Sequence, residues 1–286
     1  MMIAGMQIAP GIDALAKLAT ARVPALEVAF GRFVVQGGLC LAIAALTGRL
    51  AQLHPPSYRR HFMRGIMLAA TTVLFVSALK FMPLVDAYGI AFVEPMLLTG
   101  LSALVLKEKV GPRRWLACLA GFAGCLIVVR PNYDIFGLRA LLPLGSACAF
   151  AWYHLLTRQV AGQGTMLGSQ FVTGVAGTLA IGAALATTTA LGIAEQSAIW
   201  LEPRDMLLII GVGACSLVAH GLVVLAFERA PAMVLAPLGY LEIVAGTAFG
   251  WFVFGDFPKP ATWLGIAIIA GSGLYILNRE RLRAAG

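Results

Sequence analysis

Two glutamates interrupt apolar stretches of this sequence. Glu94, followed by Pro95, lies in AFVEPMLLTG, and Glu242 lies in GYLEIVAGTA. A bare carboxylate is costly in an apolar setting, so it holds a proton, a cation or a hydrogen-bonding partner. Each glutamate is therefore a candidate for ligand or proton binding, and the alternative is a structural acid bonded to a neighbouring helix.

Other polar side chains extend this set. Asp13 and Lys17 are four residues apart, so in a helix they share one face and can neutralise each other. Histidines in such stretches are either satisfied packing groups or proton and ligand contacts. The side chains that we predict to contact a ligand or line a path for it are Asp13, Lys17, Arg32, Glu94, Trp152, His154, His220, Tyr240 and Glu242, with Pro95 as a helix-breaking hinge.

Motifs for catalysis, metals and nucleotides are absent from the sequence. The five cysteines form no CxxC pair and no Cys/His cluster at zinc spacing. There is no HExxH, GxSxG or GxxxxGK[ST] motif. We therefore expect no catalytic residue, no metal site and no cofactor.

The composition places these residues in a membrane protein. Of the 286 residues 60% are hydrophobic and 12% charged, and the mean hydropathy is +0.87. Soluble domains average about 25% charged residues. Too little polar surface remains to coat a soluble globule, so we predict a polytopic all-α membrane protein.

Apolar runs long enough to cross a bilayer predict ten transmembrane helices. A spanning helix needs roughly 20 apolar residues. The predicted spans are Met2–Ala19, Ala25–Leu46, Phe62–Lys80, Leu84–Leu106, Arg113–Arg130, Leu138–Arg158, Gly168–Leu191, Met206–Glu228, Pro231–Phe254 and Ala261–Asn278.

The basic residues between these spans predict the orientation. Thirteen lie in one set of alternate connections or at the span ends beside them, and six lie in or beside the other set. The larger set is Arg49, Arg59, Arg60, Arg64, Lys107, Lys109, Arg113, Arg114, Arg158, Arg229, Arg279, Arg281 and Arg283, and the smaller is Arg22, Lys80, Arg130, Arg139, Arg204 and Lys259. Because cytoplasmic loops collect Lys and Arg, both termini are predicted to be cytoplasmic. The net charge of +8 thus indicates topology and no nucleic-acid partner.

The two glutamates belong to an internal repeat. A constant offset of 148 positions relates the pairs Ala78/Ala226, Pro83/Pro231, Glu94/Glu242, Thr99/Thr247, Pro112/Pro260 and Trp115/Trp263. The offset maps the third to fifth spans onto the eighth to tenth, so the unit is five helices. Since five is odd, the second copy is inverted, as in many secondary transporters. We predict the two repeats to be residues 1–132 and 133–286.

These residues also carry a family resemblance. The first copy reads ALKFMPLVDAYGIAFVEPMLLTGLSALVLKEKVGPRRWLACLAGFAGCLIVV, and the second reads AFERAPAMVLAPLGYLEIVAGTAFGWFVFGDFPKPATWLGIAIIAGSGLYIL. The Glu-Pro pair at mid-span, the acid fourteen positions later and the Pro- and Trp-containing loop resemble EamA-type members of the drug/metabolite transporter superfamily. One departure is Ile243, where the family often has proline, so the two halves are expected to bend differently.

The resemblance implies a secondary transporter of a small organic metabolite in a bacterial-type inner membrane, working by alternating access. It favours efflux over uptake. The alternatives are a passive channel or exchanger for heteroaromatic or cationic metabolites, and an intramembrane lipid-modifying enzyme. A monomer and a homodimer are both compatible with the sequence.

The mixed charges predict the class of cargo. Acids and bases at mid-span suit a ligand that carries both charges, because a singly charged ligand would leave partners unpaired in an apolar interior. We therefore predict an amino acid or an amino-acid-like metabolite. Proton coupling through either glutamate and uncoupled exchange are both open.

The predicted topology can be tested by labelling. Single cysteines at His54 and Gln196, in a cysteine-free background, should react differently with an impermeant thiol reagent in intact cells. We expect labelling at Gln196 only, because the basic residues place His54 in the cytoplasm. Labelling at His54 would contradict this orientation.

Overall fold

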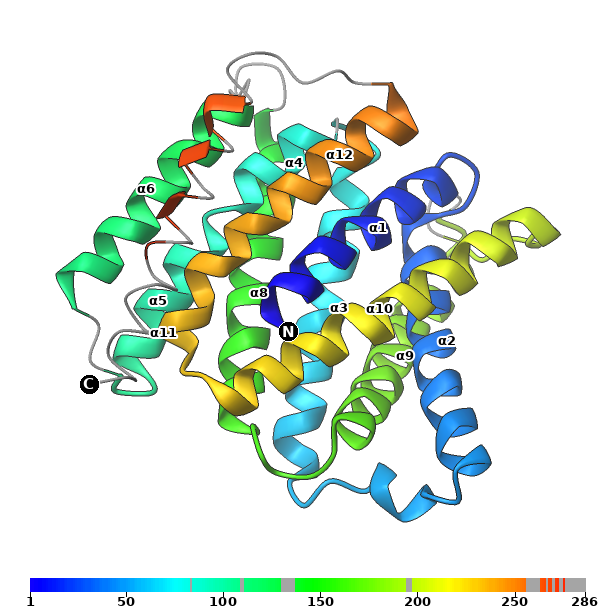
Figure 1. Cartoon of the computed structure of the whole chain (residues 1–286). Coiled ribbons are helices and arrows are strands. Elements are labelled where there is room, and N and C mark those ends of the chain that lie inside the picture. Colours follow the sequence, from blue (N-terminus) through cyan, green and yellow to red (C-terminus); the bar gives the residue numbers. More distant parts are fainter. Residues whose placement is uncertain are drawn as a thin grey trace.

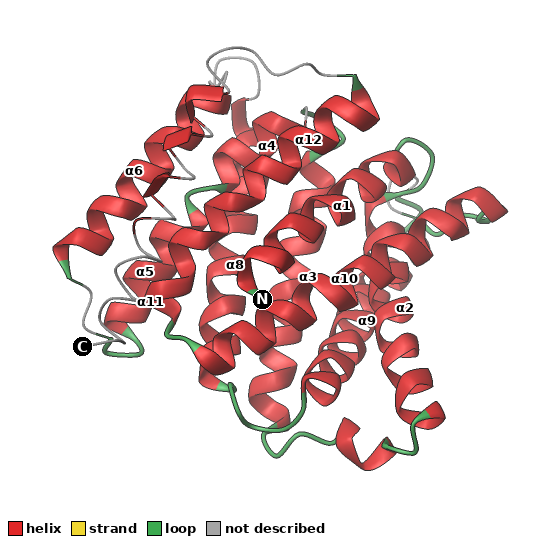
Figure 2. Ribbon diagram, viewed as in Figure 1, coloured by secondary structure: helices red, strands yellow, loops and turns green. Residues whose placement is uncertain are grey.

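The computed structural model describes residues 1–82, 84–108, 111–129, 137–193 and 197–255, with a few positions between 263 and 275. Its secondary structure in these residues is helical (Figure 2). The helices are α1 (Met2–Thr20), α2 (Ala25–Leu46), η1 (Leu50–Leu53), α3 (Tyr58–Ala78), α4 (Leu84–Ala91), α5 (Glu94–Leu104), α6 (Pro112–Val129), η2 (Gly137–Ala140), α8 (Leu141–Gln159), α9 (Met166–Ala190), α10 (Pro203–Arg229), α11 (Ala232–Leu235), η4 (Ala236–Leu241) and α12 (Glu242–Phe254).

Every predicted span up to Phe254 is present as one helix or as an interrupted series of helices. Within the described residues, six helical segments are long and apolar enough to cross a membrane by themselves. They are Ala25–Leu46, Tyr58–Ala78, Gly137–Gln159, Met166–Ala190, Pro203–Arg229 and Ala236–Val253. The predicted span Ala261–Asn278 lies largely outside the described residues. Gln196, the labelling position of the topology test, also lies outside them. The chain is thus an all-α membrane protein with the predicted fold class.

Two predicted spans are interrupted in the middle. The span predicted for Leu84–Leu106 consists of α4 and α5, and the chain leaves the α-helix at Phe92 and Val93. The span predicted for Pro231–Phe254 begins with the short α11, continues through the 3-10 segment η4, and becomes α12 at Glu242. The two interruptions differ in length, in agreement with the expectation that the halves bend differently.

The contacts between helices follow a two-fold pattern. An inverted repeat exchanges α1 with α8, α2 with α9, α3 with α10, and α5 with α12. Accordingly, α1 packs on α10 as α3 packs on α8, and α3 packs on α9 as α10 packs on α2. The pair α5 and α8 likewise matches the pair α12 and α1, while α2 and α9 pack on each other (Figure 1). These pairings are those of two inverted halves joined around a common axis.

Small residues let the central helices approach closely. A Cβ added to Gly174 on α9 would lie 2.7 Å from the Cα of Gly37 on α2. A Cβ added to Gly65 on α3 would lie 2.6 Å from the Cβ of Ala176 on α9. Such small-residue faces are a common basis of helix association in membranes, because they let backbones touch. The α2–α9 contact therefore has no room for a larger side chain at Gly174.

Replacing Gly174 with alanine should destabilise the protein. We expect Gly174→Ala to cost about 1–3 kcal/mol, the usual cost of overpacking a tight interior, and to lower the thermal midpoint in detergent. Gly38→Ala is the matched control, since Gly38 is on the same α2 helix and a Cβ there meets nothing within 4 Å. Equal midpoints for the two variants would contradict the packing described for α2 and α9.

Candidate functional site

A cavity of about 90 Å³ lies between the two halves. This volume has room for several water molecules. Residues from α1, α2, α3, α4, α5, α8, α10, η4 and α12 line it, so both halves contribute. The polar and aromatic lining residues are Asp13, Arg32, Thr71, Thr72, Phe75, Tyr88, Phe92, Glu94, Ser146, Phe150, His154, His220 and Glu242.

The cavity lies toward one side of the bundle. We define the Thr20 side as the side where α1 ends and α2 begins, and the Leu46 side as the opposite one, where α2 ends and α3 begins. The lining residues of α2 (Val28, Ala29 and Arg32) come from its first turns, and those of α3 come from its second half. Both segments belong to the Thr20 half of the bundle.

Partly buried polar contacts lie toward the other side of the bundle. Arg158 on α8 donates a hydrogen bond to the carbonyl oxygen of Phe227 on α10 at 2.8 Å. The Nε of Arg158 also lies 3.6 Å from Oε1 of Glu108, in the connection after α5. These contacts tie three segments together near the Leu46 side. They link α8 to α10 and to the connection after α5 on that side.

Glu94 and Glu242 occupy equivalent positions in the two halves. Glu94 is the first residue of α5 and Glu242 is the first residue of α12. A helix start carries partial positive charge, which favours a carboxylate in the first turn. Both glutamates also line the cavity. The interruptions of the two spans therefore place two symmetry-related acids at the cavity wall.

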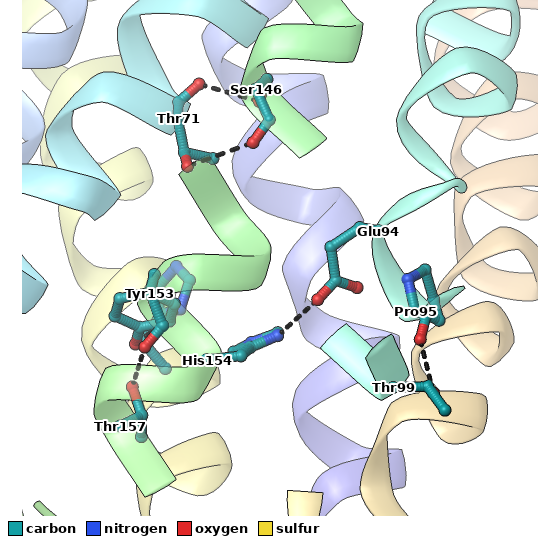
Figure 3. Close-up of polar contacts among 9 residues, drawn as sticks. Thr71, Glu94, Pro95, Thr99, Ser146, Tyr153, His154 and Thr157 are labelled. Atoms are coloured by element: carbon teal, nitrogen blue, oxygen red, sulfur yellow. Dashed lines mark hydrogen bonds and ion pairs between the residues drawn. The ribbon is translucent and has the colours of Figure 1, made fainter. Parts of the chain in front are cut away.

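Glu94 has a histidine partner from the other half. Oε1 of Glu94 and Nδ1 of His154 on α8 are 3.0 Å apart, and the two side chains point toward each other in Figure 3. Both residues are buried, with 7% and 1% of their surfaces exposed. An ionised carboxylate only accepts hydrogen bonds, so Nδ1 carries the hydrogen when Glu94 is ionised. Nε2 of His154 has no hydrogen-bond partner among the described residues.

A second acid is held by an aromatic hydroxyl. Tyr88 on α4 donates its hydroxyl to Oδ2 of Asp13 on α1 at 2.6 Å. The ring of Tyr88 stacks on Phe92, and Phe92 in turn lies 6.2 Å from the ring of Tyr240. Phe92 and Tyr240 are themselves related by the offset of 148 positions. An aromatic pair thus crosses the pseudo-two-fold axis two residues before the two glutamates.

Glu242 differs from the other acids of the cavity. No hydrogen bond or ion pair joins it to another described residue, whereas Asp13 and Glu94 each have a partner. It lies within electrostatic range of both Asp13 and Glu94. These three acids contribute negative charge to the lining of the cavity when they are ionised. No group of three metal-binding side chains in holding geometry occurs in the described part of the chain.

Arg32 provides the opposite charge. Its guanidinium donates to the hydroxyl of Thr72 on α3, and its NH2 lies 2.8 Å from Nε2 of His220 on α10. Thr72 and His220 are again related by the offset of 148 positions. Arg32 is thus held near the axis by equivalent positions of the two halves. The lining of the cavity therefore carries both signs of charge, with Arg32 as its base and three carboxylates as its acids.

Most of the predicted residues line the cavity, and three do not. Asp13, Arg32, Glu94, Pro95, His154, His220 and Glu242 are lining residues. Lys17 lies one turn beyond Asp13 and Trp152 is 43% exposed, so neither belongs to the lining. Tyr240 is fully buried against Phe92. Trp152 and Tyr240 thus lie outside the lining of this cavity, and Trp152 diverges from His154 because residues two apart on a helix face different directions.

The aromatic walls come from residues that the sequence analysis did not select. They are Phe75, Tyr88, Phe92 and Phe150. Phe150 could have been found, since it precedes His154 by one helical turn and so shares its face. The same applies to Phe92, which the repeat offset pairs with Tyr240. Tyr88 has no such signal, because the offset pairs it with Ala236.

Comparisons with known proteins agree in pointing to membrane transport. Residues 1–130 match the model of the EamA-like transporter family. A riboflavin transporter of Rhizobium johnstonii is 30% identical over 78% of this chain and 72% of its own length. An S-adenosylmethionine uptake transporter of Rickettsia bellii is 25% identical over 94% of this chain and 89% of its own length. A solved crystal structure shares the fold, with a TM-score of 0.75 and 21% identity over 98% of this chain and 97% of that one.

The buried pair of Glu94 and His154 should contribute measurably to stability. In a double-mutant cycle of Glu94→Gln and His154→Gln we expect a coupling energy of about 0.5–3 kcal/mol, as for side chains in direct contact. The free energy of unfolding can be followed by SDS titration in mixed micelles. The exposed pair Arg22–Glu202, 2.8 Å apart, is the control and should give only about 0–1 kcal/mol. Additive single effects for Glu94 and His154 would show that the contact carries no net stabilisation.

Proposed function

Because the chain belongs to the EamA-like transporter family of the drug/metabolite transporter superfamily, we propose that it is a secondary transporter that carries a small organic metabolite by alternating access. The observation that carries this proposal is the charged cavity between two inverted halves. Secondary transporters place the substrate site at the interface of such halves, near interrupted helices. Here the interruptions before α5 and α12 both reach the cavity.

The chemistry of the cavity supports an amino-acid-like cargo. The lining contains one basic residue, Arg32, and three acids, Asp13, Glu94 and Glu242. A cargo with both a negative and a positive group would pair with both kinds of charge, whereas an uncharged cargo would leave them without partners. The aromatic lining of Phe75, Tyr88, Phe92 and Phe150 suits a ring or another apolar body next to those charges. A heteroaromatic or cationic metabolite is the second candidate, since the same rings and acids would hold it.

Alternating access requires the Leu46 side to open. The contacts of Arg158 with Phe227 and Glu108 close that side, and an inward-facing state must break them. With both termini in the cytoplasm, as the basic residues predict, the cavity belongs to the outer half of the membrane. The direction of net transport then follows the gradients, and the relative from Rickettsia bellii is named for uptake rather than efflux.

The proposed transport function also implies a division of the chain into two halves and a membrane location. We propose that residues 1–132 and 133–286 are the two halves, and that the protein resides in an inner membrane. A passive channel remains the main rival, because inverted repeats also occur in pores. An intramembrane enzyme is the weaker rival, since the similar proteins are named as transporters and the sequence lacks the motifs of such enzymes.

Counterflow separates a carrier from a channel. Proteoliposomes loaded with an unlabelled amino acid should accumulate the same labelled compound transiently, because the excess unlabelled compound inside competes with the labelled one for exit on a saturable carrier. A panel of amino acids, nucleosides, vitamins and quaternary amines, preselected by thermal shift, would identify the compound. Simple equilibration without an overshoot for every binding compound would favour the channel.

At least one of the two symmetry-related glutamates should be needed for transport. Glutamine keeps the shape and hydrogen-bonding capacity of the side chain and removes its charge. We expect Glu94→Gln or Glu242→Gln to lower the initial rate of counterflow by roughly tenfold or more, the factor for losing one hydrogen bond to a charged group. Glu202→Gln, at an exposed acid, is the control. Normal transport by both variants at acidic and neutral pH would leave the two glutamates with structural roles only.

A further inference from the structure

A fully buried arginine lies behind the cavity and is not part of its lining. Arg64 on α3 is 0% exposed. Its guanidinium donates to the hydroxyl of Ser169, to Oε1 of Gln170 at 2.8 Å, and to the hydroxyl oxygen of Tyr153 at 3.3 Å. It also lies over the ring of Tyr153, 5.1 Å from the centroid. Arg64 therefore binds α3 to α8 and α9 through neutral groups.

Tyr153 connects Arg64 with the cavity. Its hydroxyl oxygen lies 3.4 Å from Nδ1 of His220, and Nε2 of His220 lies 2.8 Å from NH2 of Arg32. An arginine only donates, so Nε2 of His220 must accept and its hydrogen is on Nδ1. Nδ1 then donates to Tyr153. One directed series of hydrogen bonds thus runs from Arg32 through His220 to the hydroxyl oxygen of Tyr153 and fixes which nitrogen of the neutral histidine carries the hydrogen.

Neither guanidinium has a carboxylate as a bonded partner within the described residues. Arg32 is 5% exposed and bonds Thr72 and His220, and its Nε has no partner. Asp13 attracts Arg32 electrostatically, but its hydrogen bond goes to Tyr88. A buried charge held only by neutral groups is costly unless an opposite charge joins it. Arg32 is such a charge, and it lines the cavity, where a negative group of a ligand could join it.

We propose that Arg32, held by Thr72 and His220, is the subsite for a carboxylate group of the cargo, and that Arg64 and Tyr153 are positioning residues behind it. The inference rests on the proposed transport function and specifies which group of the cargo binds where. The free Nε–H and the remaining guanidinium hydrogens supply the donors, because an arginine carries five N–H groups in a planar fork. The hydrogen-bond series through Tyr153 orients His220, and His220 orients the fork.

The charges around the cavity favour a carboxylate over a doubly charged phosphate. Asp13, Glu94 and Glu242 line the same cavity and would repel a second negative charge. Glu242, which has no bonded partner among the described residues, is available for the cationic group of the cargo. A carboxylate and an ammonium group in one molecule thus match Arg32 and the acids together.

Matched pairs of ligands test the subsite directly. Binding of tryptophan, histidine, arginine and phenylalanine to the purified protein is compared with binding of tryptamine, histamine, agmatine and phenethylamine, which lack only the carboxylate. We expect the amino acid of the bound pair to bind about tenfold or more tightly than its amine, as for a hydrogen bond to a charged group. Arg32→Lys should reduce this ratio severalfold, because lysine keeps the charge but not the fork. Arg22→Lys, at an exposed arginine, should leave it unchanged.

Tyr153→Phe tests the positioning role. The phenyl ring keeps the stacking on Phe150, whose ring plane is within 2° of that of Tyr153, and loses only the hydroxyl. We expect weaker binding of the amino acid by a factor of several, with binding of the amine unchanged. Nitrogen-15 NMR of labelled histidine should show His220 with its hydrogen on Nδ1 in the wild type, and the Nδ1 signal should shift in the variant because that hydrogen loses its acceptor. Tyr58→Phe, which removes an exposed tyrosine–histidine contact with His54, is the matched control.

The outcomes separate this inference from the proposed function. Equal binding of amino acid and amine by the wild type would overturn the carboxylate subsite and leave transport intact. Counterflow of compounds without a carboxylate, together with no binding of any amino acid, would also overturn it. A loss of affinity for both members of a pair in Tyr153→Phe would overturn the positioning role. Absence of counterflow for every bound compound would instead contradict the transport function itself.

Discussion

Compensation of charge inside an apolar bundle is the constraint on which the rest of this structure depends. Each ionisable group at mid-membrane needs a partner, a polar cavity or a ligand. Glu94 finds His154, and Asp13 finds Tyr88. Arg32 bonds only neutral groups, and Glu242 has no bonded partner in the described part of the chain. Arg32 and Glu242, which lack a bonded counter-ion among the described residues, border the same cavity, so a cargo with both charges could supply a partner to each.

The interrupted helices make this arrangement possible. In a continuous helix the backbone N–H and C=O groups bond to each other. The breaks before α5 and α12 instead place two helix starts at the cavity. Each start carries a glutamate in its first turn. The inverted repeat brings these two starts together, and the same repeat sets Thr72 and His220 on either side of Arg32. The repeat thus brings equivalent residues of the two halves to the cavity, and the differences between these residues make the two halves of the lining chemically unlike.

The fold and part of the candidate site can be predicted from the sequence. Hydropathy and the offset of 148 positions predict the helices and the relation between Glu94 and Glu242, because both signals are local or periodic. The rotation of each helix about its axis is not encoded so simply, and for this reason Trp152 was expected in the cavity and Phe150 was not. The hydrogen bond between Tyr88 and Asp13 joins α4 to α1 and has no counterpart in the other half. The link from Arg64 to Arg32 crosses four helices, so only the packed structure reveals it.

Accessibility of the cavity to cargo is the most direct measure of the account as a whole. Ala91 lines the cavity, and Ala176 is fully buried against Gly65 between α9 and α3. In a cysteine-free protein, Ala91→Cys should react with a small cationic methanethiosulfonate reagent, and a saturating amount of the compound that shows counterflow should protect it. Ala176→Cys should remain unmodified under the same conditions. Reaction at Ala91→Cys that is insensitive to the compound, or no reaction there at all, would contradict a cargo site between the two halves.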